Sequence, residues 1–297
     1  MDEMSVTSAF EVDRPRLWSI AYRMTGRVHD AEDVLQAAWL KADAAERSST
    51  PIASPTGWLS TVVSREAIDV LRRRQRRAEV SLDAGDTPVE SVDGPETDYI
   101  HVESVGRALL VVLNRLTPEQ RAAYVLHDMF DVPFATIADL LTVSTAAAKQ
   151  LASRARRRVA PPNTLEHGAD RSMVEAYLAA SRDGDIEGLL AVLAPDVVRT
   201  SEPTLVPDGH QMIRGARSVA EQTRLFADRA QVSAIALIDG RPAVIVAPHG
   251  RLRAAMLFTI DAGRIAAIRV VGSATLDDSE IAPVEGPPGL SSDRTTQ

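Results

Sequence analysis

The stretch that most constrains the fold is residues 134–159, in which two helical segments are separated by a short break. Apolar residues at helical spacing occupy 134–141, Thr142-Val143-Ser144 interrupts them, and a second segment ends in a cluster of arginines. Two short helices joined by a tight turn form a helix-turn-helix, whose second helix enters the major groove of DNA. An ordinary helical hairpin is the alternative interpretation of the same pattern.

The position of each residue in this helix pair predicts its role. Ser144 is expected to cap the second helix, and the expected inner core is Ile137, Leu141, Val143 and Leu151. Residues near the start of such a helix meet base edges, whereas arginines farther along contact phosphate. The residues expected to face DNA are Ser144, Thr145, Ala146, Lys149, Gln150, Ser153, Arg154, Arg157 and Arg158. Thr142 departs from the usual glycine of the turn, because a β-branched residue disfavours a positive φ angle.

Positive charge is concentrated in two places, although the 297 residues carry a formal net charge of −8. Five arginines occupy residues 72–77 and four occupy residues 154–158, each at the end of a helical segment. Residues 78–103 between them contain eight acidic residues and no lysine or arginine. Two cationic clusters joined by an acidic tether favour two separate contacts with a polyanion. For either cluster alone, a solvated helix face is the alternative.

The first half of the chain is predicted to be helical. Apolar residues recur at helical spacing over residues 9–47, with an interruption at Gly26, and again over residues 56–77. Residues 78–98 have the glycine, proline and acidic composition of a linker. Helices then resume, and Thr-Pro-Glu-Gln at 117–120 has the pattern of a capping box at a helix start.

The pattern changes after Pro161-Pro162. Two short helices are expected at residues 173–181 and 186–193. The β-like runs that follow are 197–198, 232–238, 242–247, 252–260 and 264–272, with a hairpin turn expected at Asp261-Ala262-Gly263. The second half is therefore predicted to be α+β, with two or three helices and an antiparallel sheet.

The sequence thus predicts a multidomain chain in five segments. They are a helical domain at 1–78, an acidic linker at 79–98, a helical domain with the helix-turn-helix at 99–160, an α+β domain at 161–274 and a disordered tail at 275–297. Cysteine is absent, no apolar run approaches the ~20 residues of a membrane span, and the acidic N-terminus has no export signal. We expect a cytoplasmic protein that uses no metal, cofactor or membrane.

Three blocks in the first half resemble the extracytoplasmic-function sigma factors of bacterial RNA polymerase. They are DAEDVLQAAWLKA at 30–42, WLSTVVSREAIDVLRRRQRR at 58–77, and residues 116–159, in the order of that family. The second half, from MVEAYLAASRDGDIEGLLAVLAPDVV at 173–198 onward, resembles the SnoaL-like branch of the nuclear-transport-factor-2-like fold. One sigma subgroup carries such a domain at its C-terminus. The resemblance implies two all-α sigma domains followed by a cone-shaped α+β domain.

The resemblance also implies an alternative sigma factor that binds core polymerase, recognises the −35 and −10 promoter elements and initiates transcription. The expected polymerase contacts are the β′ clamp helices and the β flap, and the matching positions in 30–42 are Asp30, Glu32, Asp33, Val34, Gln36 and Trp39. Val34 and Trp39 as residues of the protein's own core are the alternative. The helix 58–77 matches the reader of the −10 element, with backbone contacts expected from Arg65, Arg72, Arg73, Arg74, Arg76 and Arg77. Residues 134–159 match the reader of the −35 element.

The appended domain is expected to enclose an apolar pocket. Its candidate polar residues are Tyr177, Arg199, Asp208, His210 and His249. An Asp/His pair can act as acid and base, but the fold alone does not decide activity, and we expect regulation, with or without a small-molecule ligand, rather than catalysis. Two rival functions are a polymerase-independent, ligand-sensing helix-turn-helix regulator and a pocket enzyme with a DNA-binding arm. The 30–42 block favours the sigma factor, because a free-standing regulator has no need of it.

Overall fold

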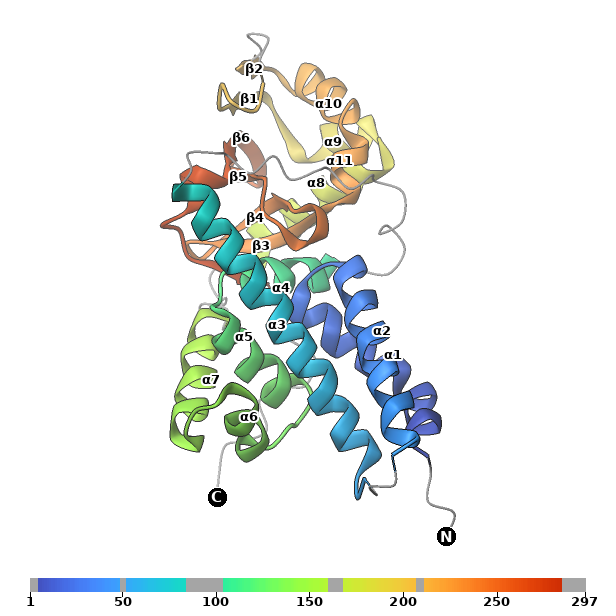
Figure 1. The fold of residues 1–297 in the computed structure, drawn as a ribbon. Helices are drawn as coiled ribbons and strands as arrows, with labels where there is room; N and C mark the ends of the chain where they lie inside the picture. Colours follow the sequence, from blue (N-terminus) through green and yellow to red (C-terminus); the bar gives the residue numbers. More distant parts are fainter. Residues whose placement is uncertain (1–4, 49–51, 84–103, 160–167, 207–210, 285–297) are drawn as a thin grey trace, which may run out of the picture. The chain divides into compact units, whose positions relative to one another are not determined.

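The computed structural model describes residues 5–48, 52–83, 104–159, 168–206 and 211–284, which divide into two compact units. The first unit contains the described residues up to 83 together with 113–157, and the second contains 104–112 and those from 158 to 284. Three long helices begin the first unit (Figure 1). They are α1 (Val6–Thr25), α2 (Val28–Glu46) and α3 (Pro55–Asp83), and each packs against the other two.

The interruption expected at Gly26 is the left-handed end of α1. Gly26 has φ 75°, a conformation that glycine adopts without steric cost, and its N–H donates to the carbonyl oxygen of Tyr22. The chain then reverses into α2, and the core of the bundle contains fully buried Leu17, Ile20 and Leu59. α3 extends farther than expected: residues 79–83, predicted to begin the linker, are its last turn. The rest of that linker, 84–98, lies outside the described residues.

The next helices carry the predicted caps. They are α4 (Ser104–Asn114), α5 (Pro118–Tyr124), a π-helical turn η1 (Val125–Met129), α6 (Phe134–Leu141) and α7 (Thr145–Val159). The capping box of α5 is confirmed, since Thr117 Oγ1 accepts from the Gln120 N–H at 3.3 Å and Gln120 Oε1 accepts from the Thr117 N–H at 3.4 Å. Ser144 caps α7 as expected, with its Oγ accepting from the Ala147 N–H at 3.1 Å.

The second unit combines helices with a curved sheet (Figure 1). Its helices are α8 (Gly168–Asp183), α9 (Ile186–Val192), α10 (Ala216–Arg224) and α11 (Ala227–Gln231). Its strands are β1 (Leu193–Ser201), β2 (Met212–Arg214), β3 (Ser233–Ile238), β4 (Arg241–Val246), β5 (Ala254–Asp261), β6 (Arg264–Gly272) and β7 (Ile281–Pro283). In the described residues they pair in the order β2-β1-β6-β5-β4-β3-β7. α8 packs on β3 and β4, and α10 packs on β1.

The turn predicted between the last two long strands is confirmed. β5 and β6 pair antiparallel, and Ala262 and Gly263 both have positive φ angles, 46° and 71°. Positive φ at both central residues matches the right-handed twist of the flanking strands. The expectation of an antiparallel sheet is wrong at one place, because β1 pairs with β6 in parallel. The long connection between them, which includes α10 and α11, makes that pairing possible.

The predicted disordered tail is wrong for its first ten described residues, 275–284. A short 3-10 turn, η4, spans Ser273–Leu276, and β7 adds an edge strand to β3. Ile281 and Ala282 are buried, so the apolar residues of this segment complete the core. Half of the residues in 275–284 are polar, and the gain from burying a few apolar side chains against an open sheet edge was not visible in this composition. Residues 285–297 lie outside the described chain.

Candidate nucleic-acid and polymerase interface, and the appended domain

The exposed side of α7 is the surface predicted to face DNA. All nine residues expected there are exposed, from Ser144 at the cap to Arg158 near the end of the helix. The opposite side contains the buried residues Ala148, Ala152, Ala155 and Val159, which recur at helical spacing. Of the three successive alanines 146–148, only Ala146 is exposed and can lie on the groove-facing side.

The turn before α7 is formed without glycine. Thr142 has φ 59° and ψ 46°, and the Val143 N–H donates to the carbonyl oxygen of Ala138 at 3.0 Å. A left-handed threonine costs about 1–2 kcal/mol, so the helix pair tolerates local strain at this position. The expected core position of Val143 is wrong, since 36% of this residue is exposed. Ile137 and Leu141 are buried as expected.

Arg156 differs from the other arginines of its cluster. Its Nε donates to Oδ1 of Asp128 in η1 at 2.5 Å, and the Asp128 side chain is almost fully buried. Tyr124 lies in the same neighbourhood: burial raises its pKa, and the Asp128 carboxylate raises it further. Arg156 therefore joins α7 to the preceding turn. Among the four arginines of 154–158, Arg156 is the one that was not assigned to the predicted DNA-facing set.

The arginines of α3 expected to contact DNA divide into two groups. Arg65, Arg73, Arg76 and Arg77 are exposed and available to a polyanion. Arg74 instead donates from Nη1 to the carbonyl oxygen of Thr25 at 2.8 Å and forms an ion pair with Asp30. Arg72 forms an ion pair with Glu119 of α5 at 3.5 Å. Other groups of the same unit bind the side chains of Arg72 and Arg74 in this conformation, so a DNA contact from either arginine stays a prediction that requires these contacts to break.

The outward side of α2 is acidic and partly apolar. Glu32, Asp33 and Gln36 are exposed, and 39% of Trp39 is exposed. Sequence reasoning missed Leu40, which is 57% exposed and follows Gln36 by one helical turn. The assignment of Val34 to the polymerase-binding surface is wrong, because this side chain is buried in the bundle. Asp30 also departs from the expected polymerase-binding surface, since its side chain forms an ion pair with Arg74 within the same unit.

A buried guanidinium joins α5 to the end of α1. Arg121 donates from Nε to the carbonyl oxygen of Arg23 at 2.9 Å and from Nη1 to Oδ1 of Asn114 at 2.5 Å. Burial, and secondarily the charge of Arg74, lowers its pKa to about 9. Both arginines bind carbonyl oxygens in the last turn of α1, where the helix dipole is negative. The sequence contained no sign of this contact beyond a capping motif next to an arginine.

Comparison with known proteins decides the family. The family model for Sigma-70 region 2 matches residues 9–77, and that for Sigma-70, region 4 matches residues 106–159. The chain is 41% identical over 222 residues to the ECF RNA polymerase sigma factor SigJ of Mycobacterium tuberculosis (strain ATCC 25618 / H37Rv), covering 71% of this chain and 70% of SigJ. This chain belongs to the ECF sigma factors.

Two further similarities extend over nearly the whole sigma factor. It is 31% identical over 281 residues to the probable ECF RNA polymerase sigma factor SigI of the same organism, covering 92% of this chain and 95% of SigI. The match to the crystal structure of M. tuberculosis SigJ covers 89% of this chain and 95% of the SigJ chain, with 33% sequence identity and a TM-score of 0.43. The predicted function is confirmed: the protein is an alternative RNA polymerase sigma factor that initiates transcription, and its partners are core polymerase and promoter DNA. The predicted fold class, two helical sigma domains followed by an α+β domain, is confirmed as well.

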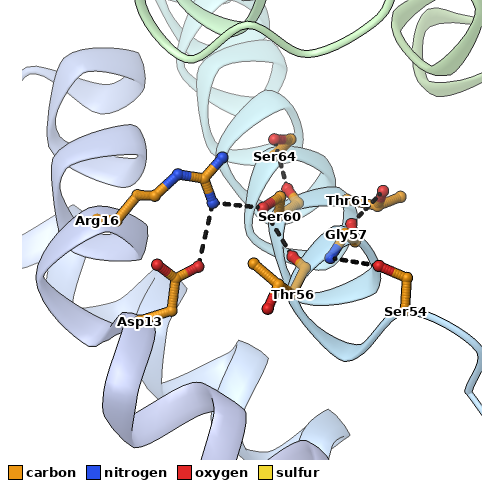
Figure 2. A network of polar contacts seen from close by, with 8 residues as sticks. All are labelled: Asp13, Arg16, Ser54, Thr56, Gly57, Ser60, Thr61 and Ser64. Carbon is orange, nitrogen blue, oxygen red and sulfur yellow. Dashed lines mark hydrogen bonds and ion pairs between the residues drawn. The ribbon is translucent and has the colours of Figure 1, made fainter.

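Region 2 of the sigma factor contains a cavity of about 330 Å³ beside the start of α3. Arg16 of α1 lies at its edge and donates from Nη1 to Asp13 at 3.1 Å and to Oγ of Ser60 at 3.0 Å (Figure 2). The hydroxyl groups that line this wall belong to Thr56, Ser60, Thr61 and Ser64. Residues 130–133 of region 4 line the opposite wall, and the Arg16 guanidinium lies 5.8 Å from the Phe130 ring centre.

In the appended domain, the structure brings together two of the five candidate pocket residues. Tyr177 of α8 and Arg199 of β1 are both buried, and each affects the pKa of the other. His249 lies in the turn between β4 and β5, whereas the β1–β6–β5 register places Arg199 level with Phe258 of β5. His249 is therefore about 13 Å or more farther along the sheet. Asp208 and His210 lie outside the described residues.

Neither a metal centre nor a membrane span is found in the described chain. No group of three or more His, Asp or Glu residues there is arranged to hold a metal ion. None of the helices described is long and apolar enough to cross a membrane.

Proposed function

We propose that this sigma factor binds the clamp helices of core polymerase through the outward side of α2. Glu32, Asp33 and Gln36 supply acidic and polar contacts, and Trp39 and Leu40 supply an exposed apolar centre. A protein interface typically has such a centre surrounded by polar groups. Val34 supports the helix from inside the bundle and does not take part in this contact.

We assign the two promoter elements to separate helices. The observation that carries the proposal is that all nine residues expected at the −35 element lie on the exposed side of α7. For the −10 element, Arg65, Arg73, Arg76 and Arg77 of α3 are exposed in the same way. The two groups of contacts resemble each other in chemistry, with arginines for phosphate, and the α7 set also includes amide and hydroxyl groups suited to base edges.

Regions 2 and 4 are held together in this structure, which supports a resting state that opens on the promoter. The −35 and −10 elements are roughly 85 Å apart along B-form DNA, at 3.4 Å per base pair. A compact body of the size of regions 2 and 4 has a radius of gyration of roughly 15 Å. It cannot contact both elements at once. The contacts of Arg121 and Arg72 between α5 and region 2 must therefore break when both elements are bound.

The appended domain modulates this activity in our proposal, because it is folded on its own core and carries a buried polar cluster. Run-off transcription with core polymerase tests the proposal, comparing the full chain with residues 1–160. We expect both to start at the same promoter with different yields. Equal yields at every concentration would refute modulation by the appended domain. Duplex binding without polymerase, together with no transcript, would favour the rival polymerase-independent regulator.

A further inference from the structure

One row of side chains crosses the face of the sheet that the helices of the appended domain cover. Strand register aligns Arg199 of β1 with Ile268 of β6, and Ile268 with Phe258 of β5. Aligned residues of neighbouring strands project from the same face. The Phe258 ring contacts Tyr177 of α8 edge-on at 5.2 Å, which identifies this face as the helix-covered one.

Arg199 is a buried cation on this face with an unused donor. Only 8% of the residue is exposed. Its Nη2 donates to Oε1 of Gln222 in α10 at 2.9 Å, while its buried Nε has no hydrogen-bond partner. No acidic side chain of the described chain forms an ion pair with it. Burial lowers the pKa of Arg199, as expected for a cation removed from water without a counter-ion.

The neighbouring polar groups are neutral and do not supply the missing negative charge. Tyr177 Oη lies 3.2 Å from Oγ1 of Thr223, which itself donates to the carbonyl oxygen of Val219 at 2.8 Å. The tyrosine hydroxyl is therefore the donor in its contact with Thr223. Burial raises the pKa of Tyr177, so the phenol stays protonated at neutral pH. An unpaired buried charge is costly, and an anion from outside the chain would relieve that cost.

The same face is apolar and not fully covered. Met256, Phe258 and Val270 pack against the core of this domain, yet each remains partly exposed. Register places Met256 beside Val270 and Phe258 beside Ile268, so the partly exposed side chains form a continuous apolar surface next to Arg199. One cation beside such a surface matches a molecule with one anionic end and an apolar body.

We propose that the helix-covered face of this sheet binds an amphipathic small-molecule carboxylic acid. Its carboxylate pairs with Arg199 and uses the free Nε donor, and its apolar chain lies on Met256, Phe258 and Val270. This inference rests on the proposed regulatory role of the appended domain and assigns a chemical class to its signal. It requires no chemical step, since a carboxylate is bound and released unchanged.

The test uses the purified full-length chain and two matched probes, decanoate and the uncharged 1-decanol, with binding measured by calorimetry. We expect the wild type to bind decanoate more tightly than 1-decanol. Arg199→Leu should weaken decanoate binding by at least about tenfold, because it removes a charge-assisted hydrogen bond, and should leave 1-decanol binding within about twofold. Arg199→Lys should retain part of the preference for the acid.

Arg269→Leu is the matched control, because Arg269 is an exposed arginine of β6 that is aligned with Thr200, the residue next to Arg199. It should bind both probes like the wild type. Thermal melting checks folding, and removal of an uncompensated buried charge should leave the midpoint of Arg199→Leu at or above that of the wild type. A wild type that does not bind decanoate, or equal decanoate affinity in wild type and Arg199→Leu, would overturn the inference. Run-off transcription measured on the same samples tests the regulatory proposal separately. A failure of the binding inference can therefore be told apart from a failure of the regulatory proposal.

Discussion

Arg121 in region 4 donates from Nε to the main-chain carbonyl oxygen of Arg23 in region 2, at 2.9 Å. The guanidinium is buried, and the last turn of α1 supplies the acceptor. Carbonyl oxygens at a helix C-terminus carry partial negative charge and lack partners within the helix, so a cation there satisfies both needs. The contact connects the two regions that separate on the promoter in our proposal, and the first two predictions concern it.

Gly26→Ala should weaken this contact. The added methyl carbon would lie 3.1 Å from both Nη2 of Arg121 and Oδ1 of Asn114, and Gly26 has φ 75°. Gly240→Ala is the matched control, because Gly240 has φ 77° and its added methyl carbon would meet nothing within 4 Å. Both should lose about 1–2 kcal/mol of stability to left-handed strain, and Gly26→Ala should also show faster hydrogen exchange in α5. Equal exchange in the two variants would contradict the role of the contact.

The stability contributed by Arg121 should rise with pH. Its pKa is about 9 in the folded chain and 12.5 when unperturbed, so above pH 9 the folded state loses the proton that the unfolded state keeps. The unfolded state then binds more protons, and the free energy of unfolding increases with pH by up to about 1.4 kcal/mol per unit. Comparison with Arg121→Met by urea denaturation between pH 7 and about 10 isolates this effect. A pH-independent difference between the two proteins would refute it.

Asp128→Asn should destabilise the helix-turn-helix by about 1 kcal/mol or more. It removes a charge from a nearly buried carboxylate that pairs with the half-exposed Arg156, whose own solvent exposure weakens the pair. Asp139→Asn is the control, because Asp139 is an exposed carboxylate of neighbouring α6. Chemical denaturation gives both free energies of unfolding. Asp128→Asn should lose more free energy of unfolding than Asp139→Asn. An equal loss in the two variants would mean that the ion pair contributes nothing to stability.

Substitution of two adjacent arginines of α7 should have different effects: one should change DNA binding and the other should change stability. Arg157→Ala should lower holoenzyme affinity for −35 duplexes of any sequence and reduce the slope of log K against log salt by about 1, because one phosphate contact is lost. Arg156→Ala should reduce stability while leaving the salt slope unchanged, since Arg156 is bound to Asp128. Fluorescence anisotropy over a range of salt concentrations measures both. The assignment fails if the two variants change the slope equally.

Leu40→Ala should weaken binding to core polymerase by about tenfold, as expected for an apolar residue at the centre of an interface. Leu40 is 57% exposed on α2, so its loss should have little effect on the fold. Val12→Ala is the control, since Val12 is a 74% exposed apolar residue on neighbouring α1. Competition with a labelled sigma factor for core polymerase provides the affinities. Unchanged affinity in Leu40→Ala would place the polymerase contact elsewhere.

Local chemistry was readable from the sequence wherever a feature depends on residues close together in the chain. Thr117 and Gln120 form the expected capping box, Ser144 caps α7, and Ala262-Gly263 forms the expected hairpin turn. The exposed side of α7 also followed from helical periodicity, because side chains three and four residues apart share one side of a helix. Three sequence blocks, at 30–42, 58–77 and 116–159, occurring in the order of the family, were enough to indicate the sigma family.

Tertiary structure decided which charges remain available and which strands pair across long connections. Arg72, Arg74 and Arg156 lie in the same arginine-rich stretches as their exposed neighbours. Each of the three is nevertheless bound to a carboxylate from another helix. The parallel pairing of β1 with β6, the incorporation of β7 and the burial of Arg199 likewise depend on contacts between distant segments. Such contacts depend on the positions of two backbones in space, which a helical period or a cluster of like charges does not contain.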